Sequence, residues 1–571
     1  MSGLAARRSG PDKRWIVVAS FLAAAVLFYF ANRASYKGYF SDDDLDNLTW
    51  PTYVGFDVYY HQLLSFKISA ENFRPVGDLY YRYLYRAFHL NYVPYVVTIQ
   101  LLHGLNVMLL FLLLRRLDFS RVAAGAGALF YSFHAAVLEI WWKPMYIFDL
   151  LCATLCLISL LLYIRGRWIL ALLPFWLAYQ SKEIAVALPI GLLGWEWWLG
   201  HRKWKRLIPF FLISLNFGLQ ALWRNRGIEP VNSYALQFSP QLLWHAVGFY
   251  YSAIFFGAFA GLGLLLLPIW VRDRRLYLGL VAVLALLAPM IVLPGRLDTV
   301  YWYVPMIGVA LVIASIAAKT PGWAIALLFL LWLPFNYAQL REKRNQILAD
   351  GNRNRALMAT LREYASQMPP VRAVVYQNVP DHVEPWGLEG AIAHVFGFPV
   401  KAVWSEAPDA KEAMTKFPML LMRFKSPPLT VEGLLRTRPE VQPYIGSMNF
   451  APESQLGSGW YDQGSKLRWI APRAEATFYR PAIATQFEIV AGIAQESLDR
   501  DGPSEVTLLE DGQALGTEVL SQSAQTLRWK LPAGNSGDKH ITILSKPARR
   551  GEPQDPRTLG IAVRAIGYTP F

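Results

Sequence analysis

The sequence predicts a polytopic α-helical membrane protein that ends in a water-soluble, strand-rich region. Two features of its composition lead to this fold class. Hydrophobic residues make up 54% of the 571 residues and charged residues only 17%, whereas a typical soluble domain has roughly 25% charged residues. The apolar excess lies in about the first 340 residues, and the remainder has the composition of an ordinary soluble protein.

Hydrophobic runs of near-spanning length account for this first part. A helix of roughly 20 apolar residues crosses a bilayer, so we expect about eleven membrane helices in a domain of residues 1–338. The first run has a basic flank but no obvious small-residue cleavage site, which favours a retained anchor over a signal peptide. The runs span residues 15–34, 93–113, 122–140, 147–164, 168–182, 184–200, 207–224, 244–270, 276–294, 300–317 and 322–338.

Basic residues indicate how these helices are oriented. Lysine and arginine gather in alternate short loops, and such loops stay in the cytoplasm. The N-terminus is then cytoplasmic. The first loop (35–92) and everything after residue 338 face the periplasmic or extracellular side of a bacterial cytoplasmic (inner) membrane. The basic loops are "RRSGPDKR" (7–14), "RRLDFSR" (115–121), "RGR" (165–167), "HRKWKR" (201–206), "RDRR" (272–275) and "AKT" (318–320).

The net charge of +14 does not indicate a nucleic-acid binder, because the basic runs lie between hydrophobic segments. The only cysteines, Cys152 and Cys156, lie four residues apart in a hydrophobic run, where we interpret them as packing residues. The C-terminal region has no cysteine, so no disulfide can hold it together.

The C-terminal region reads as two parts. Residues 339–456 predict a linker helix (339–367) and a small α/β unit, without a glycine-rich phosphate loop. Residues 457–571 predict a β-sandwich, because short strands alternate with turn signals such as Asp511-Gly512. Aromatic residues near its start are more often sandwich core than sugar-stacking platforms.

The acidic stretch "YFSDDDLDNL" (39–48) follows the first hydrophobic run directly. A carboxylate among Asp42, Asp43 and Asp44 could take the proton of an acceptor hydroxyl that attacks a sugar carried on a polyprenyl phosphate. The alternative is that these residues only cap an interfacial helix. A divalent cation (Mg or Mn) bound by them is chemically allowed but not required, and no zinc spacing such as HExxH occurs.

A phosphate that leaves on its lipid needs positive charge, which Arg and Lys supply. Three basic residues predicted on the same external face are candidate phosphate ligands: Arg74, Arg296 and Lys182. Further candidates for substrate binding there are Glu139, Glu183, Asp298, Tyr301 and Tyr303. The alternatives are an arginine that snorkels to the interface, a solvated turn at residues 182–183 and tyrosines of an interfacial belt.

Four segments add a resemblance to a known family. The stretch "FRPVGDLYYRYLYRAFHLNYVPYVVTIQLLHGLNVMLLFLLLRRL" (73–117) resembles the segment after the first loop in C-type (GT-C) glycosyltransferases, particularly bacterial relatives of the protein O-mannosyltransferases, including the tetratricopeptide type. The other three are "FHAAVLEIWWKPMYIFDLL" (133–151), "SKEIAVALPIGLLGWEW" (181–197) and "DTVYWYVPMIGVAL" (298–311). Together they cover most of residues 35–315.

The resemblance implies a GT-C-like membrane domain in which an acidic pair of the first loop carries catalysis. That pair aligns with Asp43-Asp44, and Asp42 is the near alternative. Two departures concern the substrates: "WWKPMY" (141–146) lacks an arginine often found after the aromatic pair, and the present C-terminal region replaces the tetratricopeptide array. "GWYD" (459–462) and "DPRTLGIAVRAIGY" (555–568) resemble a sandwich module of bacterial surface-glycan enzymes.

The expected function is therefore transfer of a sugar from a polyprenyl-phosphate donor to a glycan, lipid or protein acceptor, with membrane lipid as a further partner. A flippase or transporter of a lipid-linked glycan is one alternative, but it predicts internal repeats and broken helices near the bilayer midplane, and the sequence shows neither. A surface-polysaccharide polymerase or ligase is another, because it would use a similar donor but move an oligosaccharide.

Overall fold

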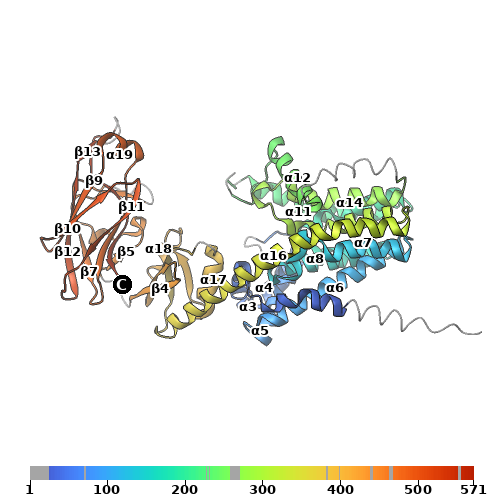
Figure 1. Ribbon diagram of the computed structural model, residues 1–571, viewed down its shortest axis with the longest axis horizontal. Helices are drawn as coiled ribbons and strands as arrows, with labels where there is room; N and C mark the ends of the chain where they lie inside the picture. The colour runs from blue at the N-terminus through green and yellow to red at the C-terminus, as the bar shows by residue number, and fades with distance from the viewer. Residues whose placement is uncertain are drawn as a thin grey trace, which may run out of the picture. The chain divides into compact units, whose positions relative to one another are not determined.

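The computed structural model describes residues 25–571 except 70–72, 227, 230–231, 257–270, 381–382, 398, 437–440, 462–466, 551–554 and 571. The chain forms two compact units, Met1–Arg355 and Ala356–Phe571. Figure 1 shows that the first unit is helical and that strands dominate the second. The hydrophobic runs predicted at 15–34 and 244–270 lie partly outside the described residues.

The first unit is built from α-helices joined by short 3-10 helices. Its α-helices are α2 (Asp42–Asn47), α3 (Trp50–Tyr53), α4 (Phe56–Leu64), α5 (Pro75–Phe88), α6 (Tyr92–Arg116), α7 (Arg121–Phe133), α8 (Ile147–Ile164), α9 (Trp168–Tyr179), α10 (Leu188–Trp198), α11 (Ile208–Asn225), α12 (Pro240–Phe255), α14 (Arg274–Ile291), α15 (Met306–Ala317) and α16 (Gly322–Ala365). The 3-10 helices are η1 (Arg33–Lys37), η2 (Ala135–Trp141), η3 (Pro144–Tyr146), η4 (Glu183–Ala187), η5 (Trp204–Leu207), η7 (Pro294–Arg296) and η8 (Thr299–Trp302).

Five segments among the described residues are long and apolar enough to cross a membrane: α6, η3 with α8, η5 with α11, α14, and α16. They become six if α7 and η2, which meet at 69°, form one bent span. The helices α9 and α15 are apolar but shorter. The helical membrane architecture is therefore confirmed, whereas the number eleven stays a prediction. Leucines on the spans, such as Leu212 and Leu330, are 60% and 64% exposed, as lipid-facing residues would be.

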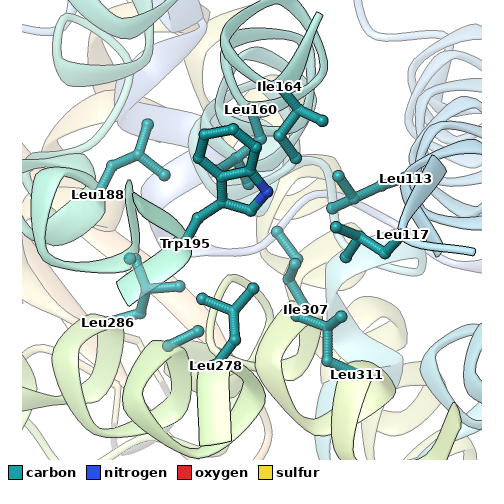
Figure 2. A pocket seen from close by; sticks show the side chains of 12 residues that line it. Leu113, Leu117, Leu160, Ile164, Leu188, Trp195, Leu278, Leu286, Ile307 and Leu311 are labelled. Atoms are coloured by element: carbon teal, nitrogen blue, oxygen red, sulfur yellow. The ribbon is translucent and has the colours of Figure 1, made fainter. Parts of the chain in front are cut away.

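Apolar side chains fill the interior between α6, α8, α10, α14 and α15. Figure 2 shows Trp195 of α10 lying among leucine and isoleucine side chains around a narrow pocket. All twelve lining residues are apolar. The lining of this pocket therefore offers packing but no ionisable side chain.

The bend between α7 and η2 is stabilised by a side chain that lies about 200 residues later in the sequence. Asn336 of α16 accepts a hydrogen bond from the Ala135 amide at 2.8 Å and donates one to the Phe133 carbonyl at 2.7 Å. Breaking a helix in apolar surroundings exposes backbone groups that are costly to leave without partners. Asn336, which is 1% exposed, supplies those partners and so fixes the direction of η2.

The second unit contains the predicted α/β part. Its sheet has the order β2-β1-β3-β4, in which β1 (Ala373–Gln377) pairs in parallel with β2 (Lys401–Trp404) and β3 (Met419–Lys425), and β4 (Thr430–Arg436) is antiparallel to β3. The helix α17 (Pro385–Phe396) connects β1 to β2, and the short helix α18 (Ala410–Ala413) follows β2.

The predicted sandwich consists of two sheets around one apolar core. Their orders are β10-β9-β12-β7 and β11-β8-β15-β5, with β6 paired to β15 and a separate β13-β14 pair. The hairpin turn predicted at Asp511-Gly512 joins β9 to β10, and both residues have the positive φ that such turns require. The elements are β5 (Tyr444–Ile445), β6 (Arg468–Trp469), β7 (Arg473–Arg480), β8 (Gln486–Gly492), α19 (Gln495–Asp501), β9 (Ser504–Glu510), β10 (Gln513–Leu520), β11 (Ala524–Lys530), β12 (Gly537–Lys546), β13 (Arg549–Arg550), β14 (Thr558–Leu559) and β15 (Ala562–Thr569).

A buried ion pair joins the α/β sheet to the sandwich. Arg423 of β3 lies 2.9 Å from Glu488 of β8, and the two side chains are 4% and 5% exposed. Tyr444 of β5 donates a further hydrogen bond to Glu488 at 3.0 Å. The boundary at residues 456/457 stays a prediction. The strand β5 precedes this position in the sequence but pairs with β15 of a sandwich sheet.

We predict that Asn336→Ala lowers the free energy of unfolding of the helical unit by about 2–3 kcal/mol, because two buried backbone groups lose their partners. Thermal unfolding of the full chain in detergent would measure this. Asn345→Ala, at an exposed position of the same helix, is the matched control. Equal stability of the two variants would contradict the role of Asn336.

Candidate functional site

Charged side chains from several segments meet at one end of the helical unit. Figure 1 shows the short helices α3, α4 and α5 of the first loop at one end of the long helices α6 and α8. Asp44 of α2 is hydrogen-bonded to Tyr81 of α5, and Arg74 at the start of α5 is paired with Glu183 of η4. Lys182, beside Glu183, is paired with Asp149 of α8. Most of the residues predicted from the sequence as candidate ligands lie on these segments.

Asp44 is completely buried and organises the start of the first loop. Its Oδ2 accepts hydrogen bonds from the Ser41 amide at 2.9 Å and the Ser41 hydroxyl at 2.8 Å, which forms a capping box on α2. Its Oδ1 accepts a hydrogen bond from the Tyr81 hydroxyl at 2.7 Å. Burial raises the pKa of Asp44 to about 6, although these hydrogen bonds favour the ionised form. Asp44 therefore acts in this structure as a structural carboxylate.

Asp43, the neighbouring residue, is half-buried. Burial acts to lower the pKa of Arg296, but the nearby phenols of Tyr301 and Tyr234 raise it above its usual value, and the charge of Asp43 adds to the increase. Asp43 therefore lies within electrostatic reach of Arg296. The side chain of Asp42 lies outside the described part of the structure. Among the described residues, no group of three His, Cys, Asp or Glu side chains is arranged to hold a metal ion.

Arg74, at the start of α5, forms a two-pronged ion pair with Glu183. Its Nε lies 3.0 Å from Oε1 and its Nη2 lies 3.1 Å from Oε2. Burial alone would raise the pKa of Glu183, but the charge and hydrogen bonds of Arg74 outweigh it and lower the pKa. Two residues predicted separately, 109 positions apart, are thus partners in one pair.

Lys182 forms the second ion pair, with Asp149 of α8 at 2.8 Å, and its ammonium group lies 5.2 Å from the ring centre of Tyr301. Asp149 was not identified from the sequence. The available signal was a single carboxylate in the apolar run "IFDLL" (147–151), since an ionisable group in such a run faces the protein interior. Asp149 is buried, so its pairing with Lys182 fixes the turn that also carries Glu183.

Arg296 differs from the other two predicted phosphate ligands. Its Nε donates a hydrogen bond to the Tyr301 hydroxyl at 3.3 Å, and its guanidinium group lies 4.1 Å from the ring centre of Tyr234. Within the described ranges of the chain, the structure shows no ion pair between Arg296 and a carboxylate. Among the carboxylates that the structure describes, none lies within ion-pair distance of Arg296, whereas Arg74 and Lys182 each have one.

A second ionic cluster surrounds Glu139 of η2. Lys143 lies 2.7 Å from its Oε2, and Lys343 of α16 lies 3.6 Å from its Oε1. Asp298 accepts a hydrogen bond from Tyr146 at 3.3 Å, and burial, with the charge of Glu139, raises the pKa of Asp298. Lys143 and Lys343 were not predicted as site residues, because a lysine beside a predicted span also fits an interface anchor.

Tyr303 does not share these contacts. It is fully buried, and its hydroxyl is hydrogen-bonded to Nδ1 of His103 at 2.9 Å and to the amide nitrogen of Asn106 at 3.1 Å. These partners lie on the membrane helix α6, which favours a packing role for Tyr303.

No protein-family model matches the sequence, and no curated protein matches it. Among solved structures, the chain is similar to the crystal structure of ArnT from Cupriavidus metallidurans bound to undecaprenyl phosphate. The identity is 13% and the TM-score 0.44, over 72% of this chain and 93% of that one. It is also similar to the CBM51-2 and INT domains of ZmpB from Clostridium perfringens, with 12% identity and a TM-score of 0.15, over 27% and 37% of the two chains. Because the identities and TM-scores are this low, neither similarity supports an argument about function. Such an argument must come from the chain's own residues.

We predict that the buried carboxyl group of Asp44 makes stability depend on pH. Its folded pKa of about 6 lies above the ordinary value, so its contribution is full at low pH and is lost as the pH rises through about 6. The expected loss between about pH 4 and pH 7 is roughly 1–3 kcal/mol. Unfolding midpoints of the purified chain in detergent would measure it.

Asp44→Asn should remove this component, because an amide does not titrate in that range. Tyr81→Phe should shift the transition to higher pH, because it deletes a hydrogen bond to the ionised form. An Asp44→Asn variant with the wild-type pH dependence would show that another group is responsible.

Proposed function

We propose that the chain is a membrane glycosyltransferase of the GT-C type, which transfers a sugar from a polyprenyl-phosphate donor to an acceptor hydroxyl at the outer face of the cytoplasmic membrane. The observation that carries this proposal is the placement of Arg296. It is a partly buried arginine, without a described carboxylate in ion-pair distance, within electrostatic reach of Asp43. A cation for a phosphate and a carboxylate for a proton thus occur together.

The donor's phosphate would bind between the three basic side chains. Arg296 offers a full positive charge. Arg74 uses only Nε and Nη2 for Glu183, which leaves further N–H groups for a phosphate oxygen. Lys182 has three donors and gives one to Asp149. The lipid tail of the donor would remain among the apolar helices, so only its polar end needs these ligands.

The chemical step would need one base and one anion site. The oxygen of the acceptor hydroxyl attacks the anomeric carbon, and Asp43 takes the proton of that hydroxyl. The bond from that carbon to the phosphate oxygen breaks, and the lipid phosphate leaves with one more negative charge. Arg296 stabilises that charge as it develops, which is where an electrostatic contact accelerates a reaction most. Asp44 keeps the loop in place, so it is a positioning residue in this scheme.

The arrangement favours an enzyme over a flippase. Charged groups in a transporter are expected near the bilayer midplane, whereas here they gather beside the first loop at one end of the spans. A polymerase or ligase would use the same donor chemistry and differ in the acceptor. The acceptor in this proposal is a glycan, a lipid or a protein hydroxyl, and the second cluster around Glu139 is the candidate surface that binds it.

We predict that Asp43→Asn lowers sugar transfer at least 100-fold, because a general base typically contributes that much and an amide is not basic. Expression and membrane insertion should be normal. Transfer into sealed vesicles of known orientation, with a polyprenyl-phosphate sugar, is the measurement. Asp57→Asn, an exposed position of the same loop, is the control. Full activity in Asp43→Asn, Asp42→Asn and Asp44→Asn alike would exclude this acidic stretch as the base.

We predict that Arg296→Ala lowers kcat/KM for the donor roughly 30-fold, which corresponds to about 2 kcal/mol of lost transition-state stabilisation. Arg296→Lys should lower kcat/KM less. Arg74→Gln should lower both donor use and stability, because it leaves Glu183 without its partner. The double variant Arg74→Gln/Glu183→Gln should recover stability but not donor use. Donor titrations that show no change in Arg296→Ala and in the double variant would place the phosphate elsewhere.

A further inference from the structure

An open apolar groove lies on the surface of the helical unit between α10 and the first half of α11. Its volume is about 360 Å³, well beyond that of a single water molecule. Ile208 and Leu212 are 54% and 60% exposed there. The lining residues are Leu193, Trp204, Leu207, Ile208, Phe211, Leu212 and Leu215.

This groove lies at the end of the helices opposite to the candidate site. The C-terminal end of α11 contacts the first loop, because Arg224 donates a hydrogen bond to the Ser69 carbonyl at 2.8 Å. Asn216, in the middle of α11, donates one to the Phe66 carbonyl at 2.9 Å. Lys205 precedes Arg224 by nineteen residues, about 28 Å along a helix. The end of the groove at Trp204 and Leu207 therefore lies at the opposite end of α11 from the contact with Ser69, on the side of the other membrane leaflet.

The segment beside the groove carries unbalanced positive charge. Arg202, Lys203 and Lys205 are exposed, Arg206 is half-buried, and the described ranges show no ion pair for any of them. Two tryptophans accompany them: Trp197 precedes them with 61% exposure, and Trp204 lies between Lys203 and Lys205 with 37% exposure. Tryptophan and basic side chains together are typical of the level where lipid headgroups lie.

The carboxylate of this segment, Glu196, does not neutralise that charge. It is 1% exposed, and it accepts hydrogen bonds from the Lys203 amide at 2.9 Å and the Tyr163 hydroxyl at 3.0 Å. Glu196 thus orders the backbone of the loop while the basic side chains point to solvent. Arg202 adopts a left-handed conformation, with φ of 54°, that arginine rarely takes. The loop is thereby held in one defined shape beside the groove.

We propose that this groove and loop bind one anionic glycerophospholipid of the leaflet opposite to the candidate active site. Its acyl chain lies along the apolar groove, and its phosphate is held by Arg202 and Lys205. Charge complementarity selects an anionic lipid over a zwitterionic one, since each basic side chain near a membrane surface attracts anionic lipid. The site is independent of the proposed reaction and contains none of its residues.

The test is lipid binding to the purified full chain by native mass spectrometry, with phosphatidylglycerol and phosphatidylcholine as probes. The wild type should retain phosphatidylglycerol in preference. Arg202→Asn/Lys205→Gln should weaken its binding about 30-fold, and asparagine tolerates the left-handed conformation. Leu212→Trp, which fills the groove and keeps every charge, should also weaken it.

Arg165→Gln/Arg167→Gln is the matched control. It removes two exposed charges after α8, at the same end of the bundle but outside the groove lining. This variant should bind phosphatidylglycerol as the wild type does. Equal binding of both lipids by the wild type would overturn the proposal. An equal loss in the control, or no loss in Leu212→Trp, would also do so, because each would mean that only general surface charge attracts the lipid.

Discussion

The ion pair between Lys182 and Asp149 is the interaction on which the arrangement of the candidate site depends. Asp149 projects from a membrane helix into the protein interior, where an uncompensated carboxylate would be costly. Lys182 neutralises it and so holds the turn before η4 against α8. That turn also carries Glu183, whose two oxygens fix the guanidinium of Arg74. One internal charge thus determines the position of a residue far away in the first loop.

The adjacent carboxylates of Asp43 and Asp44 in the first loop have different surroundings. Asp44 is enclosed, with hydrogen bonds to both of its oxygens, so it gives the loop its shape. Asp43 is half-buried and lies within electrostatic reach of Arg296. A helix places consecutive side chains about 100° apart, which explains how neighbours in sequence come to face the interior and the site.

The sequence was sufficient to predict the helical membrane unit, the α/β part and the strand-rich end, because hydrophobic periodicity and turn residues act locally. It also predicted Arg74, Glu183, Lys182 and Arg296 as candidate site residues, since charges beside apolar runs are conspicuous. It did not reveal that Arg74 and Glu183 neutralise each other, nor that Lys182 pairs with Asp149, because pairing is decided by tertiary packing. The bend after Phe133 was equally hidden, since its stabilising amide, Asn336, lies 203 residues away.

The buried pair of Arg423 and Glu488 has a consequence for how the C-terminal region can be inherited or dissected. The arginine belongs to the α/β sheet and the glutamate to the sandwich, so neither part has a neutral interior without the other. Excision of the sandwich at a boundary drawn from sequence would remove the carboxylate that neutralises Arg423 and expose the surface that both parts bury together. The two parts should therefore travel together through recombination, resist proteases as one fragment, and be expressed as one piece that begins upstream of β1.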